Sequence, residues 1–407
     1  MPRGSRGAAP WLPGQCSRGH ARARLRLDAL LNARSALGTP APIGRSVPTS
    51  LFAAKELPER PHGGSGDGGA RGECRTRGMS GADVVDRALE ATVVPSFTRV
   101  GSAIRARLEH WTPIERYDLA GRVIVITGAT SGLGHAAAEI LARDGATIEV
   151  IARSEHKAVG VVDELRAVAP DCDHGYALAD MGDFHAVRSA AEELRARHDR
   201  IDVLVHNAGA LDAELARAPS GIEQTVASQV AGPFLLTALL LDALRAASPG
   251  RVLWMTSGGM YTQPLDVDAL EPDPTTYRGA MTYARAKRAQ VTLVEMIAAR
   301  LDPSSVVVHA VHPGWADTPG VARSLPTFRR VVGPLLRTPA QGADTLVWLA
   351  ADDGEPVRTS GLLWHDRRPR PAHRRNLTKK ADTPDERRRL WEWCVDVTGV
   401  DIPADRT

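Results

Sequence analysis

The sequence predicts an α/β protein with a doubly wound, parallel, seven-stranded sheet, an N-terminal amphipathic helical arm and a C-terminal helix. Three observations support this fold class. Short apolar runs alternate with helical patterns from residue 119 onward, a glycine-rich turn follows the first of these runs, and a tyrosine and a lysine stand four positions apart in a later helical pattern. Strands that alternate with helices are typical of a parallel sheet covered by helices on both faces.

The expected strands are seven apolar runs of four to six residues. They cover residues 123–127, 148–152, 175–178, 203–206, 252–256, 306–311 and 361–364. Runs of this length between helical patterns are typical of strands that are buried on both faces of a parallel sheet. We therefore place the sheet domain at residues 118–366.

An arm with helical patterning, residues 79–117, precedes the sheet domain. Its apolar residues recur at helical spacing and predict one amphipathic stripe, made of Phe97, Val100, Ile104, Leu108 and Trp111. Three arginines lie off this stripe: Arg99, Arg105 and Arg107. We expect the stripe to dock on the sheet domain, with contact between residues 97–111 and a membrane surface as the alternative.

A C-terminal tail, residues 367–407, follows the sheet domain and is expected to contain a helix. The segment Thr383–Glu386 has the pattern of a capping box with proline at the first helical position. The apolar stripe of this helix would be Leu390, Trp391, Cys394 and Val395, and Gly399 would end it. We expect the helix to pack on the sheet domain.

Charge is distributed unevenly along the chain. Residues 1–78 hold thirteen Arg or Lys against five Asp or Glu, a net charge of +8, so the whole-chain charge of +3 leaves −5 for residues 79–407. The first segment is rich in Arg, Gly, Pro and Ser without sustained periodicity, which is typical of disorder. We expect it to be dispensable, with translation beginning at Met79; a targeting peptide is the alternative.

The remaining composition narrows the possible functions. The negative net charge of residues 79–407 offers no field for nucleic acid, although a basic nucleic-acid-binding tail at residues 1–78 is a third interpretation of that segment. The four cysteines, Cys16, Cys74, Cys172 and Cys394, show no close spacing. We therefore expect neither a disulfide framework nor a zinc site, which favours a cytoplasmic location.

The glycine-rich turn joins the first strand to the first helix of the sheet domain. Its candidate binding residues are Thr127, Gly128, Ser131, Gly132, Leu133 and Gly134. Glycine lets the backbone approach a pyrophosphate closely, and the N-terminus of the following helix supplies N–H groups and a positive dipole. The order of strand, turn and helix therefore predicts a Rossmann-type site for a nicotinamide dinucleotide.

The end of the second strand bears on the choice between NADP(H) and NAD(H). An NAD site usually places a carboxylate there to bind the ribose 2′-hydroxyl. This strand ends in Ala152-Arg153-Ser154 instead, and the Arg153 guanidinium suits a 2′-phosphate. We expect NADP(H) as the preferred cofactor, with NAD(H) possible and a solvated Arg153 as the competing interpretation.

Tyr283 and Lys287 are the candidate catalytic pair. Residues four apart lie on one face of a helix, so the phenol and the ammonium group are neighbours. Free tyrosine has a pKa of about 10, and a cation within about 4–6 Å favours the phenolate. Tyr283 would then exchange a proton with the oxygen of a carbonyl or an alcohol. A surface tyrosine beside a solvated lysine is the alternative.

These residues resemble the short-chain dehydrogenase/reductase family over roughly residues 118–365. Further segments carry the resemblance: Asp180 after the third strand, Asn207, Ala208 and Gly209 after the fourth, Ser257 after the fifth, and Pro313, Gly314 and Thr318 after the sixth. The resemblance implies that Ser257 binds the substrate oxygen and that Tyr283 and Lys287 also contact the cofactor. It implies that the remaining segments bind the cofactor as well.

Two features narrow the resemblance. The gap between Ser257 and Tyr283 is similar to that of the retinol-dehydrogenase-like branch, and the arm together with residues 361–368 resembles the dehydrogenase/reductase member 12-like group. Three positions depart from the family pattern. His206 replaces an asparagine, Ala177 stands where an aspartate often faces adenine, and Gln229 replaces the asparagine that holds a water in the family's proton relay. The resemblance therefore assigns Gln229 to the catalytic relay with an altered geometry.

We expect an NADP(H)-dependent oxidoreductase that interconverts a carbonyl and an alcohol on a lipophilic small molecule, without a metal ion. The flanking residues Met260, Leu211, Trp315 and Leu325 favour an apolar substrate, although they could equally belong to the core. His312 is expected to pack at the end of its strand and not to bind zinc. A cofactor-binding sensor or scaffold with little activity, suggested by Gln229, is the alternative.

Overall fold

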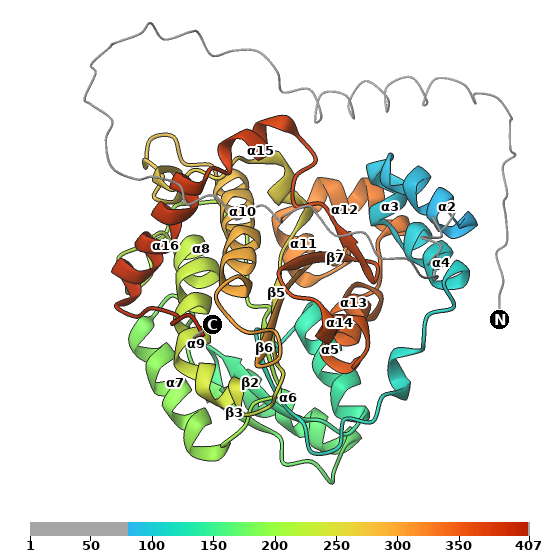
Figure 1. Ribbon diagram of the computed structural model, residues 1–407, viewed down its shortest axis with the longest axis vertical. Helices are drawn as coiled ribbons and strands as arrows, with labels where there is room; N and C mark the ends of the chain where they lie inside the picture. The colour runs from blue at the N-terminus through green and yellow to red at the C-terminus, as the bar shows by residue number, and fades with distance from the viewer. Residues whose placement is uncertain (1–79, 406–407) are drawn as a thin grey trace, which may run out of the picture. The chain divides into compact units, whose positions relative to one another are not determined.

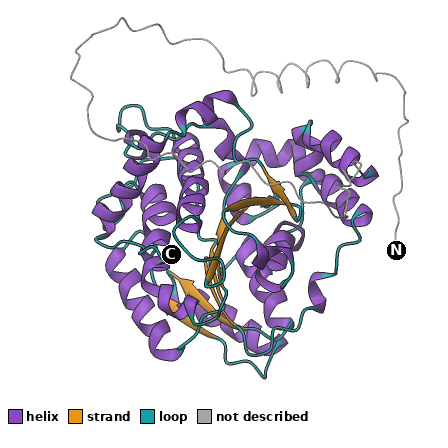
Figure 2. Cartoon of the chain, viewed as in Figure 1, coloured by secondary structure: helices purple, strands orange, loops and turns teal. Residues whose placement is uncertain are grey.

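The computed structural model describes residues 80–405. The predictions for residues 1–78, and for Met79 as the first translated residue, lie outside this range. In the described range, the α/β class and the doubly wound parallel sheet are confirmed, and helices connect the consecutive parallel strands (Figure 2). The predicted helical arm and C-terminal helix are also present.

The sheet has eight strands in the order β3-β2-β1-β4-β5-β6-β7-β8, one more than the sequence predicts. The first seven run parallel and β8 pairs antiparallel with β7. The strands are β1 (Val123–Thr127), β2 (Thr147–Ala152), β3 (Gly175–Leu178), β4 (Val203–His206), β5 (Gly250–Met255), β6 (Val306–Val311), β7 (Leu362–His365) and β8 (Arg368–Arg370). Each predicted strand lies within two residues of an observed one.

Two layers of helices bury the sheet (Figure 1). One face is covered by α5 (Gly132–Arg143), α6 (Glu155–Val168) and α13 (Pro339–Ala351), and the other by α7 (Phe184–Arg197), α9 (Gly232–Arg245), α10 (Gly279–Ala298) and α16 (Pro384–Thr398). Shorter elements are α8 (Gln224–Val226), η2 (Ala227–Ala231), η3 (Gly258–Thr262), η4 (Asp268–Leu270), α11 (Pro319–Ser324), α12 (Pro326–Val332), η5 (Gly333–Leu335), α14 (Glu355–Arg358) and α15 (Asn376–Ala381). The central strands β4, β5 and β6 are therefore buried along their whole length.

The register of the central strands gathers the predicted site residues at one edge of the sheet. Ile126 of β1 pairs with Val205 of β4, and His206 of β4 pairs with Trp254 of β5. The carboxyl ends of these strands therefore lie side by side, with Thr127, Asn207 and Thr256 at or just past them. Ligands of doubly wound sheets bind at this edge, where the strand order reverses between β1 and β4.

The additional strand arises from a two-residue hairpin turn at Asp366 and Arg367, which have φ values of 54° and 53°. Such turns favour Asn-Gly, because both central residues must adopt positive φ. An arginine is uncommon there, so the sequence carries no turn signal. The predicted domain boundary between residues 366 and 367 falls inside this hairpin, and residues 367–370 belong to the sheet.

The arm docks on the sheet domain through only part of the predicted apolar stripe. It forms α2 (Gly81–Glu90), α3 (Val93–Phe97), α4 (Arg99–Leu108) and η1 (Ile114–Arg116), and α3 ends before α4 begins, at Thr98. Phe97 is buried, but Val100 and Leu108 of the predicted stripe are 42% and 43% exposed, whereas Arg105 is 1% exposed. The prediction of an apolar docking stripe therefore holds for Phe97 but is wrong for Val100 and Leu108, because buried carboxylates draw Arg105 inward. The outward apolar face leaves membrane contact as an expectation.

The C-terminal helix α16 begins where the sequence predicts. The Thr383 side chain accepts a hydrogen bond from the Glu386 N–H, and Gly399 ends the helix with φ 69°. Glu386 does not complete a capping box, because its carboxylate accepts from the Val267 N–H at 2.6 Å. Leu390, Trp391 and Cys394 are buried and pack the helix onto the sheet domain.

One stretch among residues 80–405, Gln224–Arg245, is long and apolar enough to cross a membrane by length and composition. It spans α8, η2 and α9, and 78% of its apolar window is buried inside the protein. Its composition is therefore also that of a core helix.

Candidate active site

The glycine-rich turn between β1 and α5 has the backbone that its sequence requires. Gly128 and Gly132 have φ values of 69° and 61°, a region that other residues rarely adopt. Gly134 leaves no room for a side chain, because an added Cβ would lie 2.3 Å from Asn207 Nδ2. These glycines let the turn fold tightly against β4.

Hydrogen bonds between Thr127 and the end of β4 fix this turn to the neighbouring strand. Thr127 Oγ1 accepts from the N–H groups of Asn207 and Ala208, each at 3.0 Å. Asn207 Nδ2 in turn donates to the carbonyls of Thr127 and Gly128, at 3.2 and 3.1 Å. Gly209 lies farther along the same segment, where an added Cβ would be 2.9 Å from Gln229 Oε1.

The N-terminus of α5 fits an anionic group. Ser131 is the N-cap residue, but its side chain makes no capping hydrogen bond, so the first N–H groups of the helix have no side-chain partner. Thr318 lies opposite, where a Cβ added to Gly132 would meet it at 3.4 Å. Leu133 points elsewhere and packs near Gly342 of α13. The turn and Thr318 thus form a cradle suited to a pyrophosphate.

Arg153 and Asp180 lie at the same edge of the sheet. The Gly128 N–H donates to Ile151 O at 3.1 Å, which places the end of β2, and Arg153 two residues later, beside the turn. The Arg153 side chain is 71% exposed, and its Nη1 lies 3.4 Å from Asp180 Oδ2. Asp180 also accepts from the Gly182 N–H at 2.9 Å. An exposed guanidinium with one long contact is free to meet another anion.

The candidate catalytic side chains meet at the end of β5. Tyr283 and Lys287 project from α10, and the lysine Nζ lies 5.3 Å from the centroid of the tyrosine ring. Lys287 is 3% exposed and donates to Met255 O at 2.9 Å. Ser257 is two residues beyond Met255, lies near enough to the Tyr283 hydroxyl to oppose the rise of its pKa, and accepts from the Gly259 N–H at 3.3 Å. The structure therefore brings the three predicted residues together.

Burial shifts the protonation of this group. Burial raises the pKa of Tyr283 above its usual value, and the hydrogen bond with Ser257 only partly opposes this shift. Burial also lowers the pKa of Lys287 to about 7, so this cation is only partly charged at neutral pH. Burial therefore favours the protonated phenol of Tyr283, and the ionisation of Tyr283 with the help of Lys287 stays a prediction.

Gln229 makes its hydrogen bonds within the protein, and its part in the proton relay stays a prediction. It lies in the π-helical turn η2, and its backbone carbonyl accepts from Gln290 Nε2 at 2.6 Å. Its side-chain Nε2 donates to Ala210 O at 2.7 Å. His206, the other departure at this edge, is buried, contacts Thr237 Oγ1 at 2.8 Å, and has its pKa lowered to about 3 by burial. It is therefore a neutral packing residue.

The loop after β6 contains the remaining predicted residues, Pro313 and Gly314. His312, just before them, is buried, and its Nδ1 accepts from the Gly314 N–H at 2.7 Å, as expected of a residue that packs at a strand end. Gly314 has a φ of 72°. Sequence reasoning missed two residues that support this loop, Phe97 of the arm and the buried Arg337, because no short motif links them to it.

The residues expected on the substrate side divide into two groups. Met260 is fully buried in the core, and its carbonyl accepts two hydrogen bonds from Arg288, at 3.2 and 2.9 Å. Leu325 is 41% exposed at the start of α12, and Trp315 is half-buried between Phe97 and Phe328. Met260 therefore belongs to the core, whereas Leu325 and Trp315 remain candidates for contact with a substrate.

Comparisons with known proteins bear on the family of this chain. A family model described as short chain dehydrogenase matches residues 122–327. Dehydrogenase/reductase SDR family member 12 of Bos taurus is 34% identical over 275 residues, covering 68% of this chain and 86% of that protein. Retinol dehydrogenase 14 of Mus musculus is 30% identical over 299 residues, covering 69% of this chain and 86% of that protein. A solved short chain dehydrogenase of Escherichia coli CFT073, complexed with NADPH, has a TM-score of 0.52 at 23% identity and covers 63% of this chain and 100% of that chain. Both relatives fall in the groups that the sequence resembles.

Proposed function

The chain belongs to the short chain dehydrogenase family, and from this premise we propose that it is an NADP(H)-dependent oxidoreductase that reduces the carbonyl of a lipophilic small molecule or oxidises the corresponding alcohol. One observation carries the proposal. Ser257, Tyr283 and Lys287 meet at the carboxyl edge of the sheet, where the glycine-rich turn also lies. This arrangement combines a proton donor, a hydrogen-bond donor and a cation beside a cradle for a dinucleotide.

The proposed mechanism follows from the protonation of the three side chains. Because burial raises the pKa of Tyr283, its hydroxyl keeps a proton at neutral pH and can donate it to a substrate carbonyl oxygen. Ser257 holds the same oxygen by a hydrogen bond and stabilises the charge that develops on it. Lys287, when charged, stabilises the phenolate left after the proton transfer. The bound cofactor supplies or accepts the hydride.

A substrate screen tests this function. Purified protein is given a panel of apolar ketones and aldehydes with NADPH or NADH, and cofactor oxidation is followed by absorbance. Tyr283→Phe should lower turnover by about 10²–10⁴-fold, because the proton donor is lost, while NADPH binding stays unchanged. Near-native turnover by Tyr283→Phe would overturn the assignment.

The preference for NADP(H) is a finer proposal that rests on Arg153. Its exposed guanidinium stands beside the glycine-rich turn, and the structural neighbour from Escherichia coli binds NADPH on the same fold. Arg153→Asp should weaken NADPH binding about ten- to hundredfold, since a hydrogen bond to a charged group contributes about 1.5–3 kcal/mol. Binding of NADH should change far less. If titration gives the same NADPH affinity for wild type and Arg153→Asp, Arg153 does not contact the cofactor phosphate.

A cofactor-binding sensor is the second candidate. The observation that favours it is that the carbonyl and the side-chain nitrogen of Gln229 are already hydrogen-bonded within the protein, to Gln290 and to Ala210. Stoichiometric NADPH binding without turnover on the whole panel would support the sensor. Turnover that depends on Tyr283 would exclude it.

A further inference from the structure

We propose that the N-terminal arm, through Phe97, positions the Ser257–Gly258 turn against the loop of residues 312–318 and so completes the active site. The inference rests on the function proposed above. It adds a positioning residue, Phe97, from a segment that precedes the sheet domain in the chain. Its evidence comes from three sets of contacts: those of the ring, those of the backbone, and those of the ion-pair network beneath them.

The Phe97 ring fills the space between the two active-site segments. Its centroid lies 4.5 Å from that of His312 and 5.8 Å from that of Trp315, both in or next to the loop after β6. On its other side is Gly258, which directly follows Ser257. A Cβ added to Gly258 would lie 2.6 Å from His312 Nε2 and 3.0 Å from Phe97 Cε2. The ring therefore touches both segments at once.

The backbone of Phe97 is bonded to the same loop. Its carbonyl accepts from the Trp315 N–H at 2.7 Å and from Arg337 Nε at 3.2 Å. A Cβ added to Gly314 would come within 2.8 Å of this carbonyl and 2.5 Å of Arg337 Cζ. The arm thus approaches the predicted cofactor loop so closely that only glycine fits between them.

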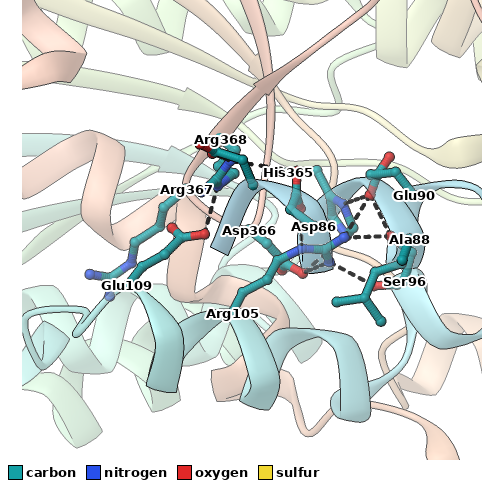
Figure 3. Close-up of polar contacts among 12 residues, drawn as sticks. Asp86, Ala88, Glu90, Ser96, Arg105, Glu109, His365, Asp366, Arg367 and Arg368 are labelled. Atoms are coloured by element: carbon teal, nitrogen blue, oxygen red, sulfur yellow. Dashed lines mark hydrogen bonds and ion pairs between the residues drawn. The ribbon is translucent and has the colours of Figure 1, made fainter. Parts of the chain in front are cut away.

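A buried ion-pair network holds Phe97 in this position, and Figure 3 shows the part of it around Arg105 and Asp366. Arg105 of α4 donates to Asp86 at 2.7 Å, to Glu90 at 2.8 Å and to Asp366 at 2.5 Å. Asp366 also pairs with Arg337 at 2.5 Å. Arg337 in turn donates hydrogen bonds to the backbone carbonyls of Ser96 and Phe97. The side chains of Arg105, Asp366 and Arg337 are each at most 2% exposed. The network therefore links the arm, the β7–β8 turn and the loop after β6.

This arrangement affects chemistry because the two segments serve different partners in the proposed reaction. Ser257 binds the substrate oxygen, whereas the 312–318 loop is predicted to bind the cofactor. Reacting atoms must be held within a narrow range of distances, and a displacement of about 1 Å can lower a rate about hundredfold. A change in Phe97 should therefore act on turnover before it acts on folding.

The test compares two buried phenylalanines in the full chain. Phe97→Ala and Phe97→Leu are measured beside Phe234→Leu, whose ring packs edge-on against Trp391 of α16. We expect both Phe97 variants to lower kcat about ten- to hundredfold at a temperature well below their melting temperature. Phe234→Leu should lower the melting temperature while its kcat stays within twofold of wild type. Phe97→Leu keeps most of the apolar volume of the side chain. It therefore gives the kcat comparison even if Phe97→Ala does not fold.

A second readout separates this inference from the proposed function. The fluorescence of NADPH depends on the surroundings of its nicotinamide. The increase of NADPH fluorescence on binding should therefore be smaller in Phe97→Leu than in wild type, and unchanged in Phe234→Leu. If wild type turns over no carbonyl, the proposed function fails while this fluorescence difference still supports the arm. If Phe97→Leu folds, keeps wild-type kcat and gives wild-type fluorescence, the arm plays no part in positioning the site.

Discussion

Two buried cations in this protein have opposite surroundings. Lys287, in the candidate active site, is 3% exposed and donates to a single carbonyl, that of Met255. Arg105, in the arm, is 1% exposed and donates to three carboxylates and to Ser96. The pKa of Lys287 is lowered to about 7 by burial. Burial alone favours the protonated form of Asp366, but the charges of His365, Arg337 and Arg105 hold its pKa well below the usual range.

This difference separates a cation that holds the fold together from one that is available for chemistry. Where every donor of a buried cation is matched by a carboxylate, the charge is fixed and the surrounding elements are held together. Where the cation has a single neutral acceptor, its charge is poorly compensated and can respond to a phenolate or a bound cofactor. The comparison therefore predicts that the two residues differ in what their loss removes.

The largest effect is expected from Arg105→Met. This change leaves Asp86, Glu90 and Asp366 buried with fewer counter-charges, and removal of one partner from a buried ion pair costs about 3–5 kcal/mol. The free energy of unfolding should fall by about that amount in denaturant titrations. Because the β7–β8 turn holds Asp366 and Arg367 at positive φ, the hairpin should also lose protection from hydrogen exchange.

The matched control is Arg143→Met, which removes a half-exposed arginine paired with Glu139 one helical turn away. Its effect on stability should be much smaller, since solvent screens a surface pair. If Arg105→Met and Arg143→Met destabilise the protein equally, the buried network does not hold the arm, and the comparison between the two cations fails.

Lys287→Met should show the reverse pattern. The change removes a poorly compensated buried charge and one hydrogen bond, so stability near neutral pH should not fall below that of wild type. Turnover should nevertheless fall about 10²-fold, because the phenolate formed at Tyr283 loses its cation. A large loss of stability with retained turnover would make Lys287 a structural residue.

The pH dependence of stability sharpens this prediction. The pKa of Lys287 is about 7 in the folded protein and about 10.4 in an unfolded chain, so the unfolded state holds the extra proton between these values. Wild-type stability therefore gains a contribution as the pH rises from about 7 to about 10, a contribution that Lys287→Met lacks. Any stability advantage of the variant should be greatest below pH 7 and shrink toward pH 10.

The active site could be predicted from the sequence because its residues lie in short motifs at fixed positions relative to strands. Gly128 and Gly132 follow β1 directly, and Tyr283 and Lys287 are one helical turn apart. The parallel sheet then brings the strand ends together without further information. The hydrogen bond from Gln290 to the Gln229 carbonyl could not be predicted, because it depends on a π-helical turn that no sequence pattern marks.

The arm could not be predicted in the same way, since its contacts join residues far apart in the chain. Arg105 and Asp366 are 261 positions apart, and neither belongs to a recognisable motif. Helical periodicity identified an apolar stripe, but Val100 and Leu108 of this stripe face solvent, because buried ion pairs turn Arg105 toward the interior. The β8 strand was missed for a related reason, since Asp366-Arg367 lacks the turn signal and depends on its ion pairs.

The smallest effect is expected at the exposed stripe of the arm. Val100 and Leu108 are 42% and 43% exposed, so Val100→Ser and Leu108→Ser should each change the free energy of unfolding by no more than about 0.5 kcal/mol. Ile114→Ser is the control, because this residue is 7% exposed and packs against the helices beside β1. It should cost more than about 2 kcal/mol. If the apolar stripe faced the sheet domain, all three substitutions should destabilise the protein equally. Because Arg105 faces inward instead, only Ile114→Ser should destabilise it.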